Sequence, residues 1–158
     1  MKESWKNRAF GLLSASLTPP RHELNELDWK AGLSANKHRM AEHLCAFANL
    51  PGGGFLAFGV ADSGDVLGVN ETEVKEILTK LSSIGREGVE PQLQIRHSVE
   101  RFEDRALLLV SIPESTVKPV HLRGKSIEEA FIRSGGTTRR ASRQDIGNLM
   151  LHSRTPRR

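Results

Sequence analysis

Residues 46–62 read AFANLPGGGFLAFGVAD, and this stretch decides the fold. Pro51 ends a preceding helical pattern, because proline has no backbone N–H and its ring clashes with the previous turn. The three glycines that follow give the backbone room for a tight turn or a close approach. The unbroken apolar run 55–60 then predicts a strand that is covered on both faces. Asp62 follows this strand at the start of a hairpin turn, so a rigid scaffold holds its carboxylate.

Helical and strand-like patterns alternate along the rest of the chain. The expected elements before the central strand are an amphipathic helix within residues 1–18, a half-buried strand around 27–30 and a helix capped by Asn36. Those after it are a helix capped by Asn70 or Thr72 that ends near Gly85, strands at 93–99 and 106–112, a last short strand at 130–133 and a closing helix at 143–151 that Ser142 begins. This order indicates a single α+β domain with a mixed, mostly antiparallel sheet and helices packed on it. We expect a helical extension over residues 1–19, the domain over 20–151 and a loose basic tail over 152–158.

The composition is that of an ordinary globular protein, with 37% hydrophobic and 27% charged residues. No apolar run approaches the roughly 20 residues that span a bilayer, so we expect no membrane contact. The single Cys45 excludes an intramolecular disulfide and a cysteine metal site, which favours a cytoplasmic location. Its apolar helical surroundings predict a position in the core.

Charge is distributed unevenly along the chain. The formal net charge is +4, but the part from Lys118 to the C-terminus carries +7 and the first 117 residues carry −3. A basic C-terminal third beside an acidic remainder predicts a polyanionic partner.

Four segments in register resemble the Schlafen AlbA-like domain family. They are ELNELDWK at 23–30, AFANLPGGGFLAFGVAD at 46–62, SIPES and KPVH within 111–121, and FIRSGGTT followed by AS within 131–142. The family was formerly catalogued among divergent AAA ATPases and as DNA-binding or ATP-binding domains. Each segment alone is a weak signal, but four in the family's order and spacing are a strong one.

The candidate catalytic and metal-binding residues are Glu23, Asp28 and Asp62. The matching positions are acidic in animal Schlafen nucleases, which cleave transfer RNA and ribosomal RNA, so the resemblance implies a metal held by these carboxylates. Hard oxygen ligands suit Mg²⁺ or Mn²⁺, which can activate water at a phosphodiester. Asp28 stands where the family usually has the longer Glu, so the pocket must tighten or ligation weakens. Lys30 is a further catalytic candidate, because it would face the same side as Asp28 and could contact the scissile phosphate.

A structural interpretation of the same residues stays open. Positions 23 and 28 face opposite sides of one continuous strand, so their side chains converge only if the chain bends between them. In this interpretation Glu23 lies at the surface, Asp28 pairs with Lys30, and Asp62 forms a turn. Such a surface ion pair contributes little to stability.

A second candidate site lies in the basic C-terminal third and would bind the nucleic-acid backbone. Gly135 and Gly136 free backbone N–H groups, and the hydroxyls and guanidiniums around them suit phosphate. The N-terminus of the final helix adds its dipole. The candidate residues are Lys118, His121, Arg123, Arg133, Thr137, Thr138, Arg139, Arg140 and Arg143. The alternative is a solvated basic face on which His121 is structural.

Two absences shape the expected mode of binding. No Lys-Ser/Thr pair follows the glycines at 52–54, so we expect no ATP site. The chain has no tyrosine, and most phenylalanines fall in predicted core positions, so bases have few aromatic faces to stack on. We therefore expect recognition of backbone and shape, as for a folded RNA or a duplex.

The expected function is nucleic-acid binding, with RNA favoured and DNA as the alternative. The sharper hypothesis is a Mg²⁺- or Mn²⁺-dependent endoribonuclease that acts on structured RNA such as transfer RNA. The competing hypothesis is a non-catalytic DNA-binding or sensor module at the N-terminus of a larger transcriptional regulator or helicase-related protein. Because the animal family builds its RNA groove from two related lobes, a single lobe predicts a homodimer.

Overall fold

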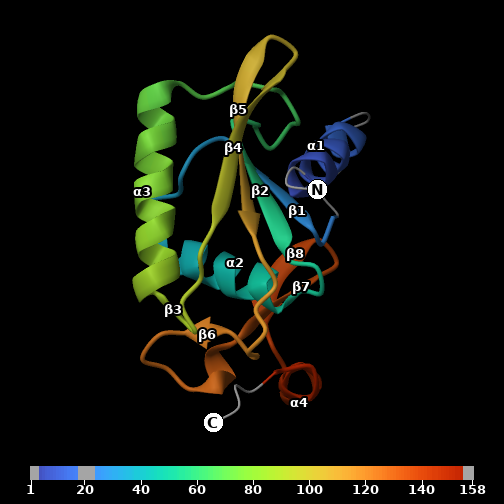
Figure 1. Ribbon diagram of the computed structural model, residues 1–158, viewed down its shortest axis with the longest axis vertical. Helices are drawn as coiled ribbons and strands as arrows, with labels where there is room; N and C mark the ends of the chain where they lie inside the picture. Colours follow the sequence, from blue (N-terminus) through green and yellow to red (C-terminus); the bar gives the residue numbers. More distant parts are fainter. Residues whose placement is uncertain (1–3, 18–23, 155–158) are drawn as a thin grey trace.

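A four-stranded mixed sheet forms the centre of the protein in a computed structural model that describes residues 4–17 and 24–154 (Figure 1). Its strands are β1 (Leu27–Lys30), β2 (Gly54–Phe58), β5 (Arg105–Ile112) and β4 (Arg96–Phe102), in that spatial order. β1 runs parallel to β2, and the other two pairs are antiparallel. The predicted α+β class with a mixed, mostly antiparallel sheet is confirmed.

Helices cover both faces of this sheet. α1 (Ser4–Leu17) lies on one face, while α2 (Lys37–Asn49) and α3 (Glu71–Glu87) lie on the other (Figure 1). Side chains alternate along each strand. Trp29 and Phe55 therefore pack with α1, while Leu56 packs with α2. β2 is buried at every position, as the unbroken apolar run predicts.

The glycines after Pro51 are required by close approach. A Cβ on Gly53 would lie 2.3 Å from the carbonyl oxygen of Ile112, and its φ of +72° favours glycine as well. A Cβ on Gly54 would lie 2.0 Å from the ring of Phe47. The end of α2 and the start of β2 are thus pressed against each other and against the end of β5.

Two small antiparallel strand pairs pack along α2. β3 (Val89–Glu90) pairs with β6 (His121–Leu122), and β7 (Phe131–Ser134) pairs with β8 (Thr137–Arg140). A 3₁₀ turn, η1 (Ile127–Glu129), and α4 (Arg143–Leu151) complete the chain order. Ser142 begins α4 in a capping box with Asp145, as the closing helix was expected to begin.

Two sequence-based expectations about elements were wrong. The strand at 130–133 is not the last one, because β8 follows it in a hairpin. The strand expected at 93–99 begins only at Arg96, since the Leu93 N–H donates to the Gly85 carbonyl instead of to a neighbouring strand. The end of α3 at Glu87 lies near Gly85, as expected, while β3 and β6 were too short for any pattern to indicate them.

The described part of the C-terminal tail is attached to the domain. The Ser153 hydroxyl accepts from the Lys118 N–H at 2.8 Å, and the Arg154 N–H donates to the Thr116 carbonyl at 2.6 Å. Residues 1–3, 18–23 and 155–158 lie outside the described residues. Across the parts of the chain that are described, no helix combines the length and the apolar character needed to cross a membrane.

Candidate functional site

Asp28 and Lys30 form an ion pair on the α2 side of edge strand β1. The Asp28 Oδ2 and the Lys30 Nζ are 3.2 Å apart. The side chain of Asp28 is 23% exposed and that of Lys30 is 25% exposed, so both are reachable from solvent. Because Leu27 and Trp29 point to the α1 side, the alternation of β1 places these two charges together against α2.

Arg133 of β7 is the centre of a buried polar network next to this pair. Its guanidinium donates to the Leu24, Asn25 and Gly136 carbonyls at 2.8, 3.0 and 3.2 Å and to the Thr138 hydroxyl at 3.1 Å. It also lies 4.7 Å from the centre of the Phe47 ring. Only 6% of the residue is exposed, so its guanidinium binds groups inside the protein. Burial lowers the pKa of Arg133, and the nearby Asp28 opposes that shift.

His43 of α2 extends the network. Its Nδ1 lies 2.7 Å from the Thr138 hydroxyl, which also accepts from Arg133. Since a guanidinium can only donate, the hydroxyl proton is available to His43 Nδ1, and the imidazole then carries its own proton on Nε2. Burial lowers the pKa of His43 to about 4, with Lys30 acting in the same direction and Asp28 against it. His43 is therefore neutral at pH 7.

The network joins two segments that are far apart in sequence. Arg133 holds the carbonyls of residues 24 and 25, and the Gly136 N–H donates to the Asn25 side chain at 2.8 Å. The β7–β8 hairpin thereby fixes the chain that leads into β1. Thr138 and Arg133, predicted to contact nucleic acid, are buried parts of this support.

The predicted metal site is incomplete in the part of the chain that the structure describes. Glu23 lies outside the described residues, while Asp62 is exposed in the hairpin after β2. Over residues 4–17 and 24–154, no three His, Cys, Asp or Glu side chains are grouped so that they could hold a metal ion. The described residues therefore do not by themselves fit a metal, and binding by Glu23, Asp28 and Asp62 stays a prediction.

The other predicted phosphate-binding residues divide into buried and exposed groups. Lys118 is buried, and its Nζ donates to Glu114 at 2.5 Å, which lowers the pKa of that carboxyl. His121 is half-buried and its Nδ1 donates to the Leu122 carbonyl. Thr137 and Arg123 are exposed, and Arg123 donates to the Arg86 carbonyl.

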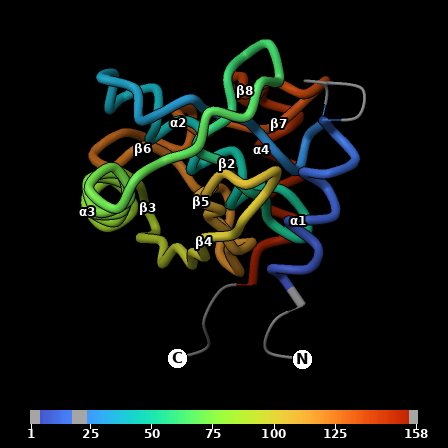
Figure 2. Tube along the Cα trace, turned by 90° about the horizontal axis from the view of Figure 1, so that it is seen from above, coloured from blue at the N-terminus to red at the C-terminus, as the bar shows by residue number. Residues whose placement is uncertain are grey.

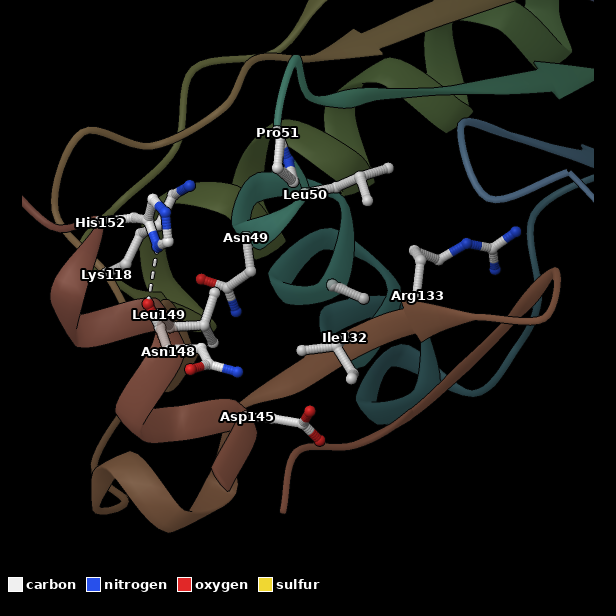
Figure 3. A pocket seen from close by; sticks show the side chains of 11 residues that line it. Asn49, Leu50, Pro51, Lys118, Ile132, Arg133, Asp145, Asn148, Leu149 and His152 are labelled. Carbon is white, nitrogen blue, oxygen red and sulfur yellow. Dashed lines mark hydrogen bonds between the residues drawn. The ribbon is translucent and has the colours of Figure 1, made fainter. Parts of the chain in front are cut away.

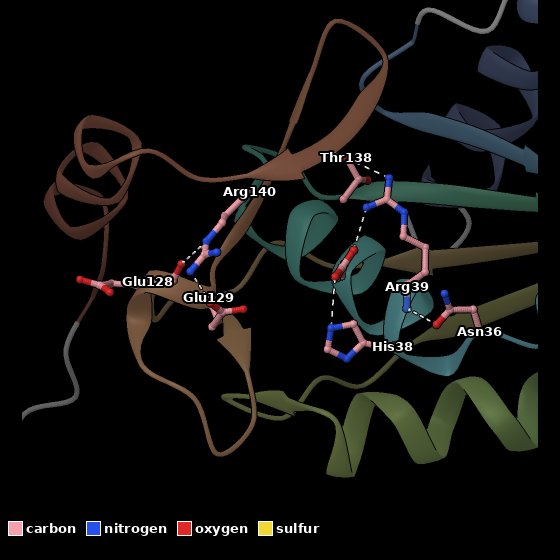
Figure 4. Close-up of polar contacts among 8 residues, drawn as sticks. Asn36, His38, Arg39, Glu128, Glu129, Thr138 and Arg140 are labelled. Atoms are coloured by element: carbon pink, nitrogen blue, oxygen red, sulfur yellow. Dashed lines mark hydrogen bonds and ion pairs between the residues drawn. The ribbon is translucent and has the colours of Figure 1, made fainter.

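Three exposed arginines lie on β8 and at the start of α4; we call Arg139, Arg140 and Arg143 the β8–α4 arginines. The side chain of Arg139 is 47% exposed and pairs with Asp145 at 3.1 Å. That of Arg140 is 59% exposed and pairs with Glu129, as Figure 4 shows. These two ion pairs leave less unpaired positive charge on the surface than the composition of the C-terminal third suggests.

Sequence reasoning missed the contributions of Arg39 and His43. Arg39 donates to the Thr138 carbonyl at 3.1 Å and to Glu42 at 2.7 Å, so α2 holds β8 from the other side (Figure 4). The available signal was their spacing: once Asn36 is taken as the cap, positions 39 and 43 share one face of the helix.

A cavity of about 260 Å³ lies between α2, β7 and α4 (Figure 3). Much of its lining is apolar, from Ala46, Leu50, Pro51, Ile132 and Leu149. The Asn49 side chain at the edge of the cavity already has hydrogen-bond partners. It accepts from the Val120 N–H and donates to the Val120 and Phe131 carbonyls. Lys118 and Arg133 also line the cavity, but both already bind groups inside the protein, so they leave little positive charge for a phosphate.

A protein-family model matches most of the chain. The family described as Schlafen, AlbA_2 matches residues 23–142, which include the carboxylate positions, α2 and the β7–β8 hairpin. No curated protein matches this chain.

Two solved structures are similar in fold. The crystal structure of the DIP2311 protein from Corynebacterium diphtheriae has a TM-score of 0.62 and 15% identity, and the match covers 97% of this chain and 30% of that one. The solution structure of the N-terminal domain of a putative ATP-dependent DNA helicase RecG-related protein from Nitrosomonas europaea has a TM-score of 0.54 and 23% identity, and the match covers 79% of this chain and 86% of that domain. This chain therefore spans less than a third of the DIP2311 protein. At these identities the likeness shows the fold alone.

Proposed function

This chain belongs to the Schlafen AlbA_2 family, and we propose that it binds nucleic acid through backbone contacts, with RNA as the favoured partner. The N-terminal domain of the RecG-related protein, whose name refers to a DNA helicase, shares the fold, and the family match together with the exposed arginines supports a role on nucleic acid. The observation that carries the proposal is the group of β8–α4 arginines.

The β8–α4 arginines are both accessible and well positioned. β8 is held by Arg39, His43 and Arg133, and α4 begins in a capping box, so the backbone that carries the arginines is fixed. Exposed ion pairs such as those of Arg139 and Arg140 contribute only about 0–1 kcal/mol. Their guanidiniums can therefore exchange a carboxylate for a phosphate at little cost, and Arg143 has no carboxylate partner among the described residues.

Recognition of backbone and shape follows from the aromatic residues. The six phenylalanines are buried or half-buried, and Phe10 and Phe102 contact each other at 5.8 Å between ring centres. Trp29 is also buried, and Trp5 is half-buried. Single-stranded recognition by stacking needs exposed rings, so a folded RNA or a duplex is the better partner.

A catalytic role is the finer form of the proposal. Its support is Asp28, a partly exposed carboxylate that pairs with Lys30 next to the buried Arg133 network. With Glu23 and Asp62 it would hold Mg²⁺ or Mn²⁺, and that ion would supply an activated water and a positive charge at the cleaved phosphodiester. Lys30 would then bind the phosphate. With the metal ion and Lys30 together, the chain would act as an endoribonuclease.

The competing proposal is a non-catalytic DNA-binding module in a longer regulator, in which Asp28 and Lys30 are only an ion pair. In either form a second copy of the chain could complete a groove, as a homodimer. Light scattering at high concentration tests the dimer, and a monomer at all concentrations contradicts it.

The experiment that tests the function combines binding and cleavage. Transfer RNA and a DNA duplex are each incubated with the protein in Mn²⁺ or Mg²⁺, with EDTA and Asp28→Asn as controls. Defined RNA fragments that vanish in both controls support the endoribonuclease. Intact RNA or DNA that still binds supports the module, and absence of binding to both contradicts the proposed function.

A further inference from the structure

A second cavity, of about 400 Å³, opens between the start of α2, the end of α3 and the turn after β6. These three segments lie together on one side of the molecule (Figure 2). Its floor is apolar and buried, from Ala41, Ile84 and Leu122. Its rim is basic, and sequence analysis assigned only one of these rim residues, Arg123.

Three cations line this pocket without a carboxylate partner. They are Lys37 from α2 and Arg123 and Lys125 from the turn after β6. None of the ion pairs among the described residues includes any of them. The pocket contains one carboxylate, Glu87, which accepts from the Ser83 hydroxyl at 3.1 Å. Three cations against one carboxylate leave a formal charge of +2.

The turn that carries two of these cations is fixed by its backbone. The Arg123 N–H donates to the Gly88 carbonyl at 3.0 Å, and the Gly124 N–H donates to Glu90 at 3.0 Å. The Lys125 N–H closes the turn on the Leu122 carbonyl. Lys37 begins a helix that Asn36 caps. All three charges therefore start from ordered backbone, which reduces the entropy lost when they bind an anion.

The contrast with the β8–α4 arginines identifies this pocket as a different kind of site. Arg139 and Arg140 lie on an exposed strand and already share their charge with carboxylates, while the pocket cations surround a concave space. An internal phosphodiester carries one charge and continues into sugars on both sides. A terminal phosphomonoester carries a charge of about −1.5 to −2 at pH 7 and ends in free oxygens that can enter a pocket.

We propose that this pocket, lined by Lys37, Arg123 and Lys125, binds the terminal phosphate of a nucleic-acid strand. This proposal rests on the proposed function, because the strand itself is held by the β8–α4 arginines. The positive end of the α2 dipole adds to the attraction. The apolar floor accommodates the first sugar or base of the strand.

The test compares one structured RNA hairpin in three forms, with a 5′-phosphate, with a 3′-phosphate and with hydroxyls at both ends. Fluorescence anisotropy measures the affinity of each at fixed ionic strength. We expect one phosphorylated form to bind at least about tenfold more tightly than the hydroxyl form, since even one hydrogen bond to a charged group is worth that much. The form that gains affinity identifies which end enters the pocket.

The variant Lys37→Gln/Lys125→Gln should remove this preference and leave the affinity for the hydroxyl form within about twofold, because the strand contacts lie elsewhere. Lys75→Gln/Lys80→Gln is the matched control, with the same charge change on exposed positions of α3 outside the pocket. The control should keep the preference of the wild type.

The outcomes separate the two proposals. Equal binding of all three forms, or a preference that survives in the pocket variant, overturns the terminal-phosphate site while the proposed function stands. If no form binds, the proposed function fails. The pocket is then judged by NMR titration of the ¹⁵N-labelled protein with inorganic phosphate, where unchanged amide shifts at Gly88, Gly124 and Lys125 overturn it and saturable shifts there support it.

Discussion

Replacing Arg133 by methionine tests whether the buried network supports the site. Methionine keeps an unbranched side chain of similar reach against the Phe47 ring, but it removes all four donated hydrogen bonds. The carbonyls of residues 24 and 25 then lose their donor, and Thr138 loses one of its two partners. The change is therefore specific to the network, with little loss of packing.

The expected cost follows from the contacts. A hydrogen bond to a charged group contributes about 1.5–3 kcal/mol, but the four share one guanidinium and are not additive. Leu24 and Asn25 are half-buried, so water replaces part of what is lost. We expect Arg133→Met to lower the free energy of unfolding by about 3 kcal/mol, or Tm by roughly 10 °C for a chain of this length.

Urea unfolding followed by the fluorescence of the two tryptophans, Trp5 and the buried Trp29, measures this free energy. Arg139→Met is the matched control, because it removes an exposed arginine from the same hairpin and should cost less than about 1 kcal/mol. A loss below about 1 kcal/mol for Arg133→Met, or an equal loss for both variants, would refute the role given to the network.

Three further predictions concern pH, a buried amide and a glycine. Burial lowers the pKa of His43 from 6.5 to about 4, so the folded protein binds fewer protons than the unfolded chain between these values. The contribution of His43 to the free energy of unfolding is full above pH 6.5 and falls by up to about 3 kcal/mol as the pH drops to 4. Urea unfolding at several pH values over this range should show the loss, and His43→Gln should flatten the dependence of the free energy of unfolding on pH. Asn49→Leu should cost about 3 kcal/mol in the same assay, since three backbone groups lose their partner; an unchanged midpoint would contradict this. Gly53→Ala should cost more than about 2 kcal/mol because its Cβ meets the Ile112 carbonyl, whereas Gly135→Ala, with a φ of +59° and open space around it, should cost about 1 kcal/mol; equal unfolding midpoints would count against the close approach.

Local patterns were sufficient to predict most of the fold. The Asn36 and Ser142 caps, the break at Pro51 and the buried strand after the glycines all act through neighbours in sequence, and each lies where the pattern predicted. The pairs β3–β6 and β7–β8 could not be predicted in this way. Two-residue strands carry no periodicity, and β8, with the sequence TTRR, has no apolar residue and so resembles an exposed loop.

The site was harder to predict because charge in a sequence does not show whether it is exposed. Arg133 and Lys118 are buried and satisfied within the protein, which depends on contacts with residues 24–25 and with Glu114. Conversely, Lys37 and Lys125 lie 88 positions apart and meet only through the packing of α2 against the turn after β6. Such pairings are set by tertiary structure, and no local pattern reports them.

In the proposed function, the β8–α4 arginines bind the nucleic-acid backbone. The most direct measurement is the affinity for transfer RNA of the wild type and of Arg139→Ala/Arg140→Ala/Arg143→Ala over a range of salt concentrations. We expect weaker binding by the variant and a slope of log K against log salt that is smaller by about 2, since each lost phosphate contact removes about 0.7–0.9. An unchanged affinity and slope, with the variant still folded, would contradict it.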